Sequence, residues 1–302
     1  MKKFLVYTVV FFAIVALVDF AFGLGARYLN SHAKGGDTYN HYYITHEMSD
    51  SVLIFGSSRA IHHFNPRILE DSLGATVYNC GLDGNGILYH YGRLLAILRR
   101  HTPKMIIYDV IPSFDMEDDD FAKYLKWQKR WYDIPGVPEI FQDVNPLEKY
   151  KMLSSLYRYN RTFIPMLSDN IKPNHELDYK GYKPIYETMS VDLDRQDHHT
   201  PVEWSELKKR YFQKFVDTCR QHGVKIFFSF SPWYKAPDSG IYDEFRTFAG
   251  DNGIEIIDMY TDPELTGDPS LFADISHLNS AGADKFSAKF ASELKSLQTS
   301  QN

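Results

Sequence analysis

Five short, mainly apolar runs recur along the chain from residue 51 onward. They are near-continuous rather than alternating, which is typical of strands buried on both faces of a sheet. We therefore expect strands at Ser51–Phe55, Ala75–Asn79, Lys104–Val110, Val224–Ser231 and Ile254–Met259. Their character predicts a five-stranded parallel sheet.

Segments with helical periodicity separate these strands. We expect helices at Asn65–Leu73, Ile87–Arg100, Val202–His222, Gly240–Gly250 and Ser280–Leu297. Either Asn279 or Ser280 is suited to cap the last one. Strands that alternate with helices predict a doubly wound α/β sandwich. In such a fold, ligands bind outside the carboxyl ends of the strands, where the strand order reverses.

Residues 111–201 break this alternation. A crossover between neighbouring strands needs far fewer residues, so we predict a cap insertion, helical or irregular, at this place. Trp127 and Trp131 recur there at helical spacing among lysines. We interpret them as the core face of the cap, with a sugar-stacking platform or a membrane-interface belt as the alternatives.

The N-terminus carries a long apolar stretch. Phe4–Val18 is uncharged and follows Lys2 and Lys3, and after Asp19 the apolar character resumes as far as residue 26. A helix over residues 4–26 is long enough to cross a hydrocarbon core of roughly 30 Å. We expect a retained membrane anchor within residues 1–29, with the two lysines in the cytoplasm.

A cleaved signal peptide is the main alternative, because Ala21-x-Gly23 fits a small-residue cleavage site; a buried helix of a soluble domain is the third. The anchor and the signal peptide both export the remainder. We expect a linker at residues 30–50 and one α/β domain at 51–302.

Composition narrows the function further. The 302 residues carry 33 basic and 39 acidic side chains, a net charge of −6, which argues against nucleic acid as the main partner. The mean hydropathy of −0.36 excludes a polytopic membrane protein. Cys80 and Cys219 form no metal-ligand pattern, and a bridge between them stays open.

Gly56-Ser57-Ser58-Arg59 directly follows the first expected strand. A glycine permits a tight turn there, and a serine at the next helix N-terminus would be exposed at the edge of the sheet. Backbone N–H groups at that terminus stabilise an anion. Alternatively, Ser57 or Ser58 merely caps the helix.

Two further segments follow strands in the same way. Asp274-Ile275-Ser276-His277 comes after the fifth strand, and its carboxylate is placed to orient one nitrogen of the histidine. A capping aspartate with an exposed histidine is the alternative. Asn79 to Gly86 follows the second strand and suits either an oxyanion hole or an ordinary glycine turn.

Taken in their order along the chain, the three segments resemble the first, second and fifth blocks of the SGNH/GDSL hydrolase superfamily, and the resemblance covers residues 51–110 and 224–297. The resemblance implies a flavodoxin-like fold without metal or cofactor. It implies Ser58 as the nucleophile, with Asp274 and His277 completing a triad. The backbone N–H groups of Ser58 and Gly84 would hold the oxyanion.

One block departs from the family pattern. Where the family offers Gly-x-Asn after the third strand, this chain has Asp109. An ionised aspartate accepts hydrogen bonds and cannot donate one. We therefore expect the oxyanion hole to rest on the N–H groups of Ser58 and Gly84, with Ser113 or Asn85 as a further donor. The loss of one oxyanion donor costs roughly 10²–10³ in rate.

Other residues near these blocks are candidates for substrate binding. Arg59 would bind a carboxylate or phosphate, unless it pairs structurally with Asp83 or Asp109. Trp233 follows the fourth strand and would form a substrate wall. His62, four residues after Ser58, is a rival base.

The Gly-Ser-Ser-Arg sequence, the N-terminal anchor and the cap are similar to those of membrane-anchored SGNH-like proteins of cell-envelope acylation, such as the alginate O-acetylation proteins and the D-alanyl transfer protein of teichoic-acid modification. This resemblance implies an exported serine esterase or O-acyltransferase. Its partner would be an acylated polysaccharide or other envelope glycan, with a membrane-bound O-acyltransferase as a second partner. A non-catalytic glycan-binding or assembly module is the alternative, and a phosphodiester-cleaving or phosphate-binding protein using Arg59 is the third.

Overall fold

The computed structural model describes residues 1–118, 125–173, 179–190, 203–236 and 238–300. The chain forms two compact units. The anchor unit comprises Met1–Glu47 and Phe121–His175, and the sheet unit comprises Met48–Asp120 and Glu176–Asn302. Most of the predicted cap thus groups with the N-terminal segment. The predicted boundaries at residues 29 and 50 stay predictions.

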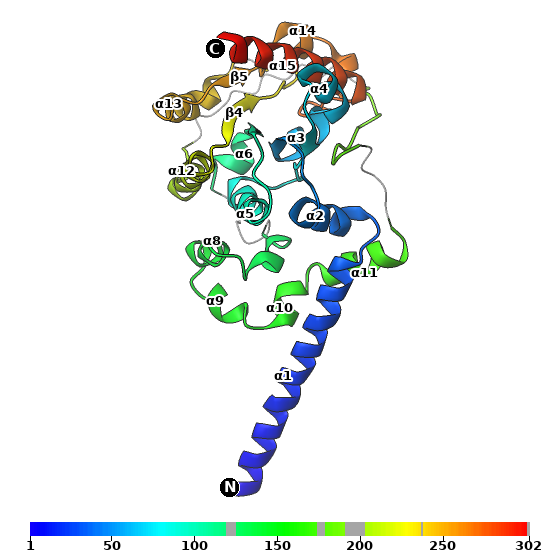
Figure 1. The fold of residues 1–302 in the computed structure, drawn as a ribbon, viewed down its shortest axis with the longest axis vertical. Helices are drawn as coiled ribbons and strands as arrows, with labels where there is room; N and C mark the ends of the chain where they lie inside the picture. The colour runs from blue at the N-terminus through cyan, green and yellow to red at the C-terminus, as the bar shows by residue number, and fades with distance from the viewer. Residues whose placement is uncertain (119–124, 174–178, 191–202, 237, 301–302) are drawn as a thin grey trace. The chain divides into compact units, whose positions relative to one another are not determined.

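The sheet unit is built on a five-stranded parallel sheet in the order β2-β1-β3-β4-β5. Its strands are β1 (Val52–Gly56), β2 (Val77–Asn79), β3 (Met105–Asp109), β4 (Lys225–Phe230) and β5 (Ile256–Asp258). All five predicted strands and the doubly wound parallel fold are confirmed (Figure 1).

The strand order reverses at β1. From β1 the chain first adds β2 on one side, and it then crosses to β3 on the other side. The register places Gly56 at the end of β1 opposite Asp109 at the end of β3. In a sheet of this order the ligand site is expected at this point, outside the carboxyl ends of β1 and β3.

Helices α4 (Pro66–Leu73) and α15 (Ser280–Ser300) cover one face of the sheet. Phe286 and Phe290 of α15 share a buried cluster with Ile54 of β1. The predicted N-cap is also present, because Asn279 Oδ1 accepts a hydrogen bond from the Gly282 amide at 3.0 Å.

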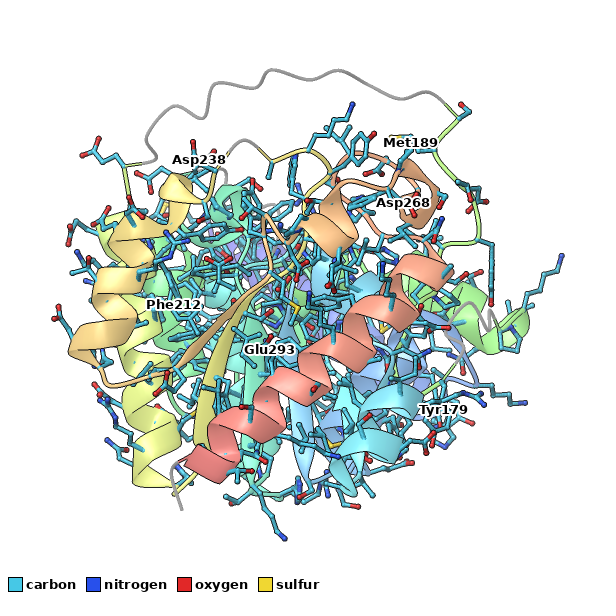
Figure 2. All side chains as sticks on the ribbon, turned by 90° about the horizontal axis from the view of Figure 1, so that it is seen from above. Tyr179, Met189, Phe212, Asp238, Asp268 and Glu293 are labelled. Carbon is cyan, nitrogen blue, oxygen red and sulfur yellow. The ribbon has the colours of Figure 1, made fainter. Side chains whose placement is uncertain are left out.

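Helices α5 (Ile87–Leu98), α12 (Glu206–Gln221) and α13 (Asp243–Asp251) cover the other face. Phe212 of α12 packs edge-on against the rings of Tyr108 and Phe228 in the sheet. On the opposite face, Glu293 of α15 is exposed (Figure 2). Because both faces are covered, the strands read as continuous apolar runs. The five predicted helices are confirmed within a few residues at their ends.

The remaining helices of the sheet unit are short. They are α3 (Ser58–His63), α6 (Pro112–Asp115), η2 (Gly240–Tyr242), α14 (Pro263–Thr266) and η3 (Pro269–Leu271). Cys80 and Cys219 are buried and free of any disulfide, and burial raises the pKa of each thiol to about 12.

The anchor unit is helical in its described residues. Its elements are α1 (Lys2–Ser31), α2 (Gly36–His46), η1 (Gln128–Trp131), α8 (Val137–Val144), α9 (Glu148–Lys151), α10 (Ser155–Tyr159) and α11 (Phe163–Ile171). By length and composition, α1 is able to cross a membrane. The segment predicted as a linker contains α2, where the His41 ring stacks on Trp127. Trp127 and Trp131 are buried, as expected for a core face.

Candidate active site

The turn after β1 exposes Ser58 at the edge of the sheet. Gly56 has a φ of +133°, and a Cβ at this position would lie 2.5 Å from the Asp109 carbonyl oxygen. Only glycine is able to make this close approach between β1 and β3. The chain then turns at Ser57, and Ser58 becomes the first residue of α3.

The structure brings Ser58 together with the two distant residues predicted beside it. The Ser58 Oγ lies 2.9 Å from His277 Nε2. His277 Nδ1 lies 2.9 Å from Asp274 Oδ2. All three residues belong to the sheet unit. The arrangement is that of a nucleophile, a base and a carboxylate that orients the base.

The Asp274 carboxylate is held ionised by its surroundings. Its Oδ1 accepts hydrogen bonds from the backbone N–H groups of Ser276, at 2.8 Å, and of His277, at 2.9 Å. Partial burial raises the pKa of Asp274, but the hydrogen bonds from His277 and Ser276 outweigh this and hold the pKa well below its ordinary value. A carboxylate in this position favours the tautomer of His277 that carries its proton on Nδ1, and in that tautomer Nε2 is free to accept.

His63 positions the loop that carries His277. The Leu278 amide donates to His63 Nε2 at 3.0 Å, and His63 is fully buried. Burial lowers the pKa of His63 well below its ordinary value, and the neighbouring His277 and Arg59 lower it further. His63 is therefore a neutral acceptor. Sequence reasoning gave it no role, although its place beside His62 was visible.

The predicted oxyanion loop is fastened to α3. Asn79 Nδ2 donates to the carbonyl oxygen of Ala60 at 2.7 Å, and Asn79 Oδ1 accepts from the Gly81 amide at 3.0 Å. Gly84 has a φ of +67°. The roles of the Ser58 and Gly84 amides as oxyanion donors stay predictions.

Arg59, predicted either to bind a substrate or to have a structural role, is engaged within the protein. The side chain is 1% exposed. Its guanidinium donates to the carbonyl oxygens of Ser231 and Val110, both at 3.1 Å, and to the Tyr242 hydroxyl at 2.8 Å. Burial lowers the pKa of Arg59, but Tyr242 and Asp109 together raise it above its ordinary value. Arg59 is a buried charge that ties α3 to the ends of β3 and β4.

Asp109 belongs to the same buried group. Its carboxylate accepts from the Ser231 amide at 3.0 Å and from the Ser231 hydroxyl at 2.8 Å. Burial raises the pKa of Asp109 to about 6, against the opposing effect of Arg59. Sequence reasoning did not find Ser231 or Tyr242 as partners, because no local motif links them to Arg59.

The two further candidate oxyanion donors, Asn85 and Ser113, and the candidate substrate wall, Trp233, differ in their exposure. Asn85 is 5% exposed, and its Nδ2 donates to the Asp83 carbonyl oxygen at 2.7 Å, so its side chain is committed to its own loop. Ser113 is exposed in α6, directly after β3. Trp233 is half-buried after β4, with its ring centroid 5.7 Å from the Arg59 guanidinium carbon. Ser113 and Trp233 stay candidates.

His62 is not the base that acts on Ser58 in this structure. Its Nε2 lies 3.0 Å from Asp83 Oδ1, and its Nδ1 lies 2.6 Å from the Lys183 carbonyl oxygen. Both ring nitrogens are thus occupied. The His62 and His277 rings are edge-on, with centroids 5.6 Å apart.

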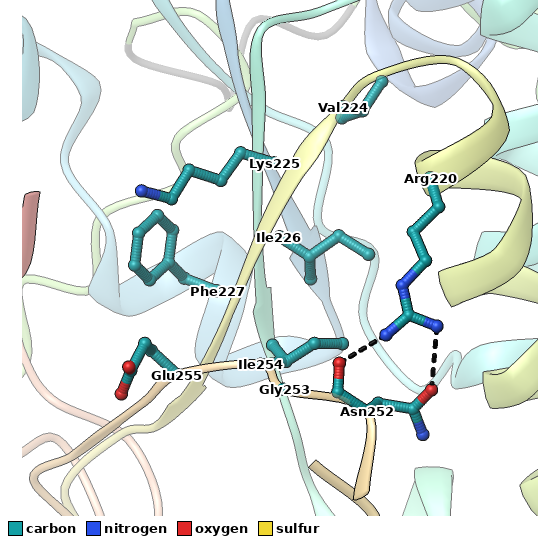
Figure 3. Close-up of a pocket in the computed structure, with 9 residues that line it drawn as sticks. All are labelled: Arg220, Val224, Lys225, Ile226, Phe227, Asn252, Gly253, Ile254 and Glu255. Atoms are coloured by element: carbon teal, nitrogen blue, oxygen red, sulfur yellow. Dashed lines mark hydrogen bonds between the residues drawn. The ribbon is translucent and has the colours of Figure 1, made fainter. Parts of the chain in front are cut away.

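A pocket of about 200 Å³ lies at the opposite end of the strands (Figure 3). It is lined by residues 224–227, where β4 begins, and 252–255, which precede β5, and Arg220 donates to Asn252 Oδ1 there at 3.1 Å. It is remote from the carboxyl ends that carry Ser58. Among the described residues, no group of three His, Cys, Asp or Glu side chains is placed to hold a metal ion.

The chain matches no family model, and no curated protein matches it. Several solved structures are similar to it. An acetylxylan esterase from Geobacillus stearothermophilus, solved as a catalytic mutant, is 13% identical, with 82% of this chain and 95% of that chain covered and a TM-score of 0.41. An α/β hydrolase from the metagenome of Lake Arreo is 13% identical, with 82% and 96% covered and a TM-score of 0.42.

A GDSL-like lipase from Bacteroides thetaiotaomicron is 7% identical, with 80% of this chain and 88% of that chain covered and a TM-score of 0.34. The structure itself gives the strand order β2-β1-β3-β4-β5. At the switch point of this sheet, His277 contacts both Ser58 and Asp274. The chain has the doubly wound parallel α/β fold that its sequence predicted.

Proposed function

We propose that this protein is a membrane-anchored, exported serine esterase or O-acyltransferase of the SGNH type. Its substrate class is acyl esters of cell-envelope glycans. The observation that carries the proposal is the continuous hydrogen-bonded series from Ser58 through His277 to Asp274, with contacts of 2.9 Å on either side of the imidazole.

The first half-reaction forms an acyl-serine. His277 Nε2 takes the hydroxyl proton as Ser58 Oγ forms a bond to the ester carbonyl carbon. Asp274 stabilises the imidazolium that results. The protonated His277 then donates its proton to the departing alkoxide, and the C–O bond to that alcohol breaks.

The second half-reaction runs the same steps with a different nucleophile. His277 removes a proton from water or from a glycan hydroxyl, and that oxygen attacks the acyl-serine. The Ser58 oxygen leaves and regains its proton from His277. The choice between the two nucleophiles is the difference between an esterase and an acyltransferase.

Contacts inside the anchor unit favour an anchor that is retained. The Asp19 carboxylate accepts from the Ser154 hydroxyl at 2.6 Å and from the amides of Ser155 and Leu156, both at 2.8 Å. A Cβ on Gly23 would lie 2.4 Å from the Ser155 hydroxyl oxygen, so glycine permits close packing of α1 on α10. Cleavage after Gly23 would remove these contacts. N-terminal sequencing of the mature membrane protein tests this, and a chain that begins after Gly23 would contradict it.

The glycan part of the proposal rests on sequence resemblance. The Gly-Ser-Ser-Arg block, the anchor and the cap are shared with SGNH-like proteins of envelope acylation. The location outside the cytoplasm is inferred from Lys2 and Lys3 at the start of α1.

A non-catalytic glycan-binding module is the second candidate. The observation that favours it is Asp109, which is buried and bonded to Ser231 where the family pattern has an oxyanion-donating Asn. The retained hydrogen bonds of Ser58 and His277 favour an enzyme, because a binding protein has no need of an activated hydroxyl.

A fluorophosphonate probe distinguishes the two candidates. We expect covalent labelling of the full chain in detergent, lost in Ser58→Ala and His277→Ala and kept in the matched control His62→Ala. If the folded parent is not labelled while it is retained on an envelope-glycan column, the binding module is the better proposal.

A further inference from the structure

The anchor unit has an unusually apolar surface on α9, α10 and α11. Leu153 is 82% exposed, and Ile164 and Ile171 are each 67% exposed. The set, which we call the apolar cap surface, comprises Leu147, Tyr150, Leu153, Leu156, Ile164, Leu167 and Ile171. On α11, Ile164, Leu167 and Ile171 follow helical spacing and form one face. Apolar side chains exposed together on neighbouring elements of one unit are typical of an interaction surface.

We propose that the apolar cap surface is immersed in the lipid bilayer that α1 spans. The protein would then contact the membrane twice, through the transmembrane helix and through the underside of its cap helices. The inference rests on the retained anchor of the proposed function. It adds a monotopic lipid contact that holds the anchor unit at a fixed depth.

The contacts of α1 fix the level of the cap along the helix. Asp19 bonds to the Leu156 amide, and Phe22 lies against Phe163 with ring centroids 4.8 Å apart. Leu156 and Ile164 therefore lie at the level of residues 19–23 of α1. Figure 1 shows the cap helices around the C-terminal half of α1, while its N-terminal half extends alone.

The part of α1 that precedes the cap contacts is too short to cross the hydrocarbon alone. Its length therefore indicates which medium surrounds the cap at the level of residues 19–23. Phe4–Val18 contributes about 22 Å at about 1.5 Å per residue. A hydrocarbon core is about 30 Å thick, so the bare segment is short by about 8 Å. Extending the span to Leu24 gives about 32 Å. The last turns of the span are the ones that carry the cap.

The side of α1 that faces away from the cap agrees with this depth. Phe20, Leu24 and Tyr28 are 59%, 51% and 62% exposed and follow one another at a spacing of four residues. Lipid that covers Phe20 and Leu24 also reaches Leu156 and Ile164 at the same level. The overlap of about 8 Å matches the depth of about 5–10 Å at which interfacial helices lie.

Charge supports a lipid surface rather than a protein partner. Lys149, Lys151, Arg161 and Lys172 are exposed around the apolar residues. The two acidic residues between positions 147 and 172 are Glu148 and Asp169, and both are buried. Basic side chains beside an apolar face favour the phosphate headgroups of a membrane.

The Asp19 carboxylate also fits this position. Within the last turns of the span an unpaired charge would be costly. Here three donors at the start of α10 satisfy it, from Ser154, Ser155 and Leu156. The acidic residue that interrupts the apolar stretch thus joins the anchor to the cap.

Depth-dependent fluorescence quenching tests the proposal on the full chain. Single cysteines at Leu156→Cys, Ile164→Cys, Phe12→Cys and Glu47→Cys are labelled with bimane, with the parent as a check on the buried native cysteines. The proteins are reconstituted in vesicles of phosphatidylcholine with a minor share of phosphatidylglycerol. Thermal melting in detergent shows that each variant is folded, and the two cap sites are independent of each other.

We expect a nitroxide near the lipid headgroup to quench the labels at Leu156→Cys and Ile164→Cys, and a nitroxide at the acyl-chain end to quench the label at Phe12→Cys. The label at Glu47→Cys, an exposed polar site of the same unit, should respond only to aqueous iodide. Iodide quenching at both cap sites would overturn the proposal while leaving the anchor intact. Loss of lipid quenching at Phe12→Cys as well would overturn the anchor with it. Shielding of the cap labels from both quenchers would assign the surface to a protein, such as a second copy of this chain.

Discussion

Two histidine–carboxylate pairs lie side by side at the carboxyl edge of the sheet. His277 contacts Asp274 at 2.9 Å, and His62 contacts Asp83 at 3.0 Å. The pairs are chemically alike, but only the second nitrogen of His277 points at a hydroxyl, that of Ser58. The second nitrogen of His62 lies against the Lys183 carbonyl oxygen. The two histidines are therefore distinguished by the group that the second ring nitrogen faces, and not by the presence of a carboxylate partner.

The origin of the difference is the element that carries each histidine. His62 lies on α3, four residues after Ser58, so its ring leans along the same helix rather than across to the hydroxyl. His277 approaches from a separate loop just before α15. Because His277 comes from a different element, its Nε2 is able to point directly at the Ser58 hydroxyl. The ring of His62, on the same helix as Ser58, lies beside that hydroxyl instead.

Exchanging the two histidines for alanine, one at a time, gives the largest expected effect. His277→Ala and Ser58→Ala should each lower kcat/KM for a p-nitrophenyl ester by on the order of 10⁶, as for nucleophile and base in other triads. His62→Ala should stay within about tenfold of the parent, because its nitrogens do not reach Ser58. Equal losses in the two histidine variants would refute the distinction.

The carboxylates should differ in the same way, with a smaller effect. Asp274→Asn should lower kcat by about 10⁴, because an amide no longer holds the Nδ1–H tautomer of His277. Asp83→Asn removes the partner of His62 and should change kcat little. Steady-state kinetics of both variants measure this, and a larger loss in Asp83→Asn would assign the working pair to His62.

The sequence predicted the elements of this edge better than the direction of their side chains. Ser58, Asp274 and His277 were identifiable because each follows a strand whose apolar run is unmistakable. The position of Arg59 was equally clear, yet its burial was not, because its partners are Ser231, directly after β4, and Tyr242 of η2. A long-range hydrogen bond leaves no local pattern.

The anchor unit shows the same limit. The apolar stretch predicted a span, and Asp19 was evident as its one interruption. That Asp19 bonds to the start of α10 depends on residues more than a hundred positions away. The predicted linker likewise contains α2, which is stabilised by tertiary packing around His41 rather than by its own propensity.

A third carboxylate, Asp109, sharpens the contrast with Asp274 through pH. Its folded pKa of about 6 exceeds the ordinary 3.8, so its contribution to stability is complete below about pH 4 and is lost as pH rises through 6. The loss amounts to about 3 kcal/mol, at 1.36 kcal/mol per pKa unit. The contribution of Asp274, whose pKa is lowered, has the opposite sign and is lost as pH falls below its ordinary value.

Urea denaturation of the parent and Asp109→Asn, followed from pH 4 to 7, isolates the buried carboxylate. We expect the free energy of unfolding of the parent to fall more steeply over this range, since Asn has no proton to release. The difference in slope is the result of interest, because the substitution also changes the hydrogen bonds to Ser231 and so shifts stability at every pH. Parallel slopes would show that Asp109 does not titrate in this range.

The third histidine of the group gives the smallest expected effect and tests positioning alone. His63 accepts from the Leu278 amide beside His277 and touches neither Ser58 nor Asp274 by any hydrogen bond that the structure describes. His63→Leu removes that acceptor, and an unpaired buried N–H costs about 1–3 kcal/mol. We expect kcat to fall about tenfold as the His277 loop relaxes, with KM and the pH profile unchanged. His63→Gln offers an amide oxygen in place of Nε2 and should restore kcat. A loss of kcat in His63→Leu that is absent in His63→Gln would identify the hydrogen bond as the cause. Equal losses of kcat in both variants would mean that only the shape of the buried ring matters.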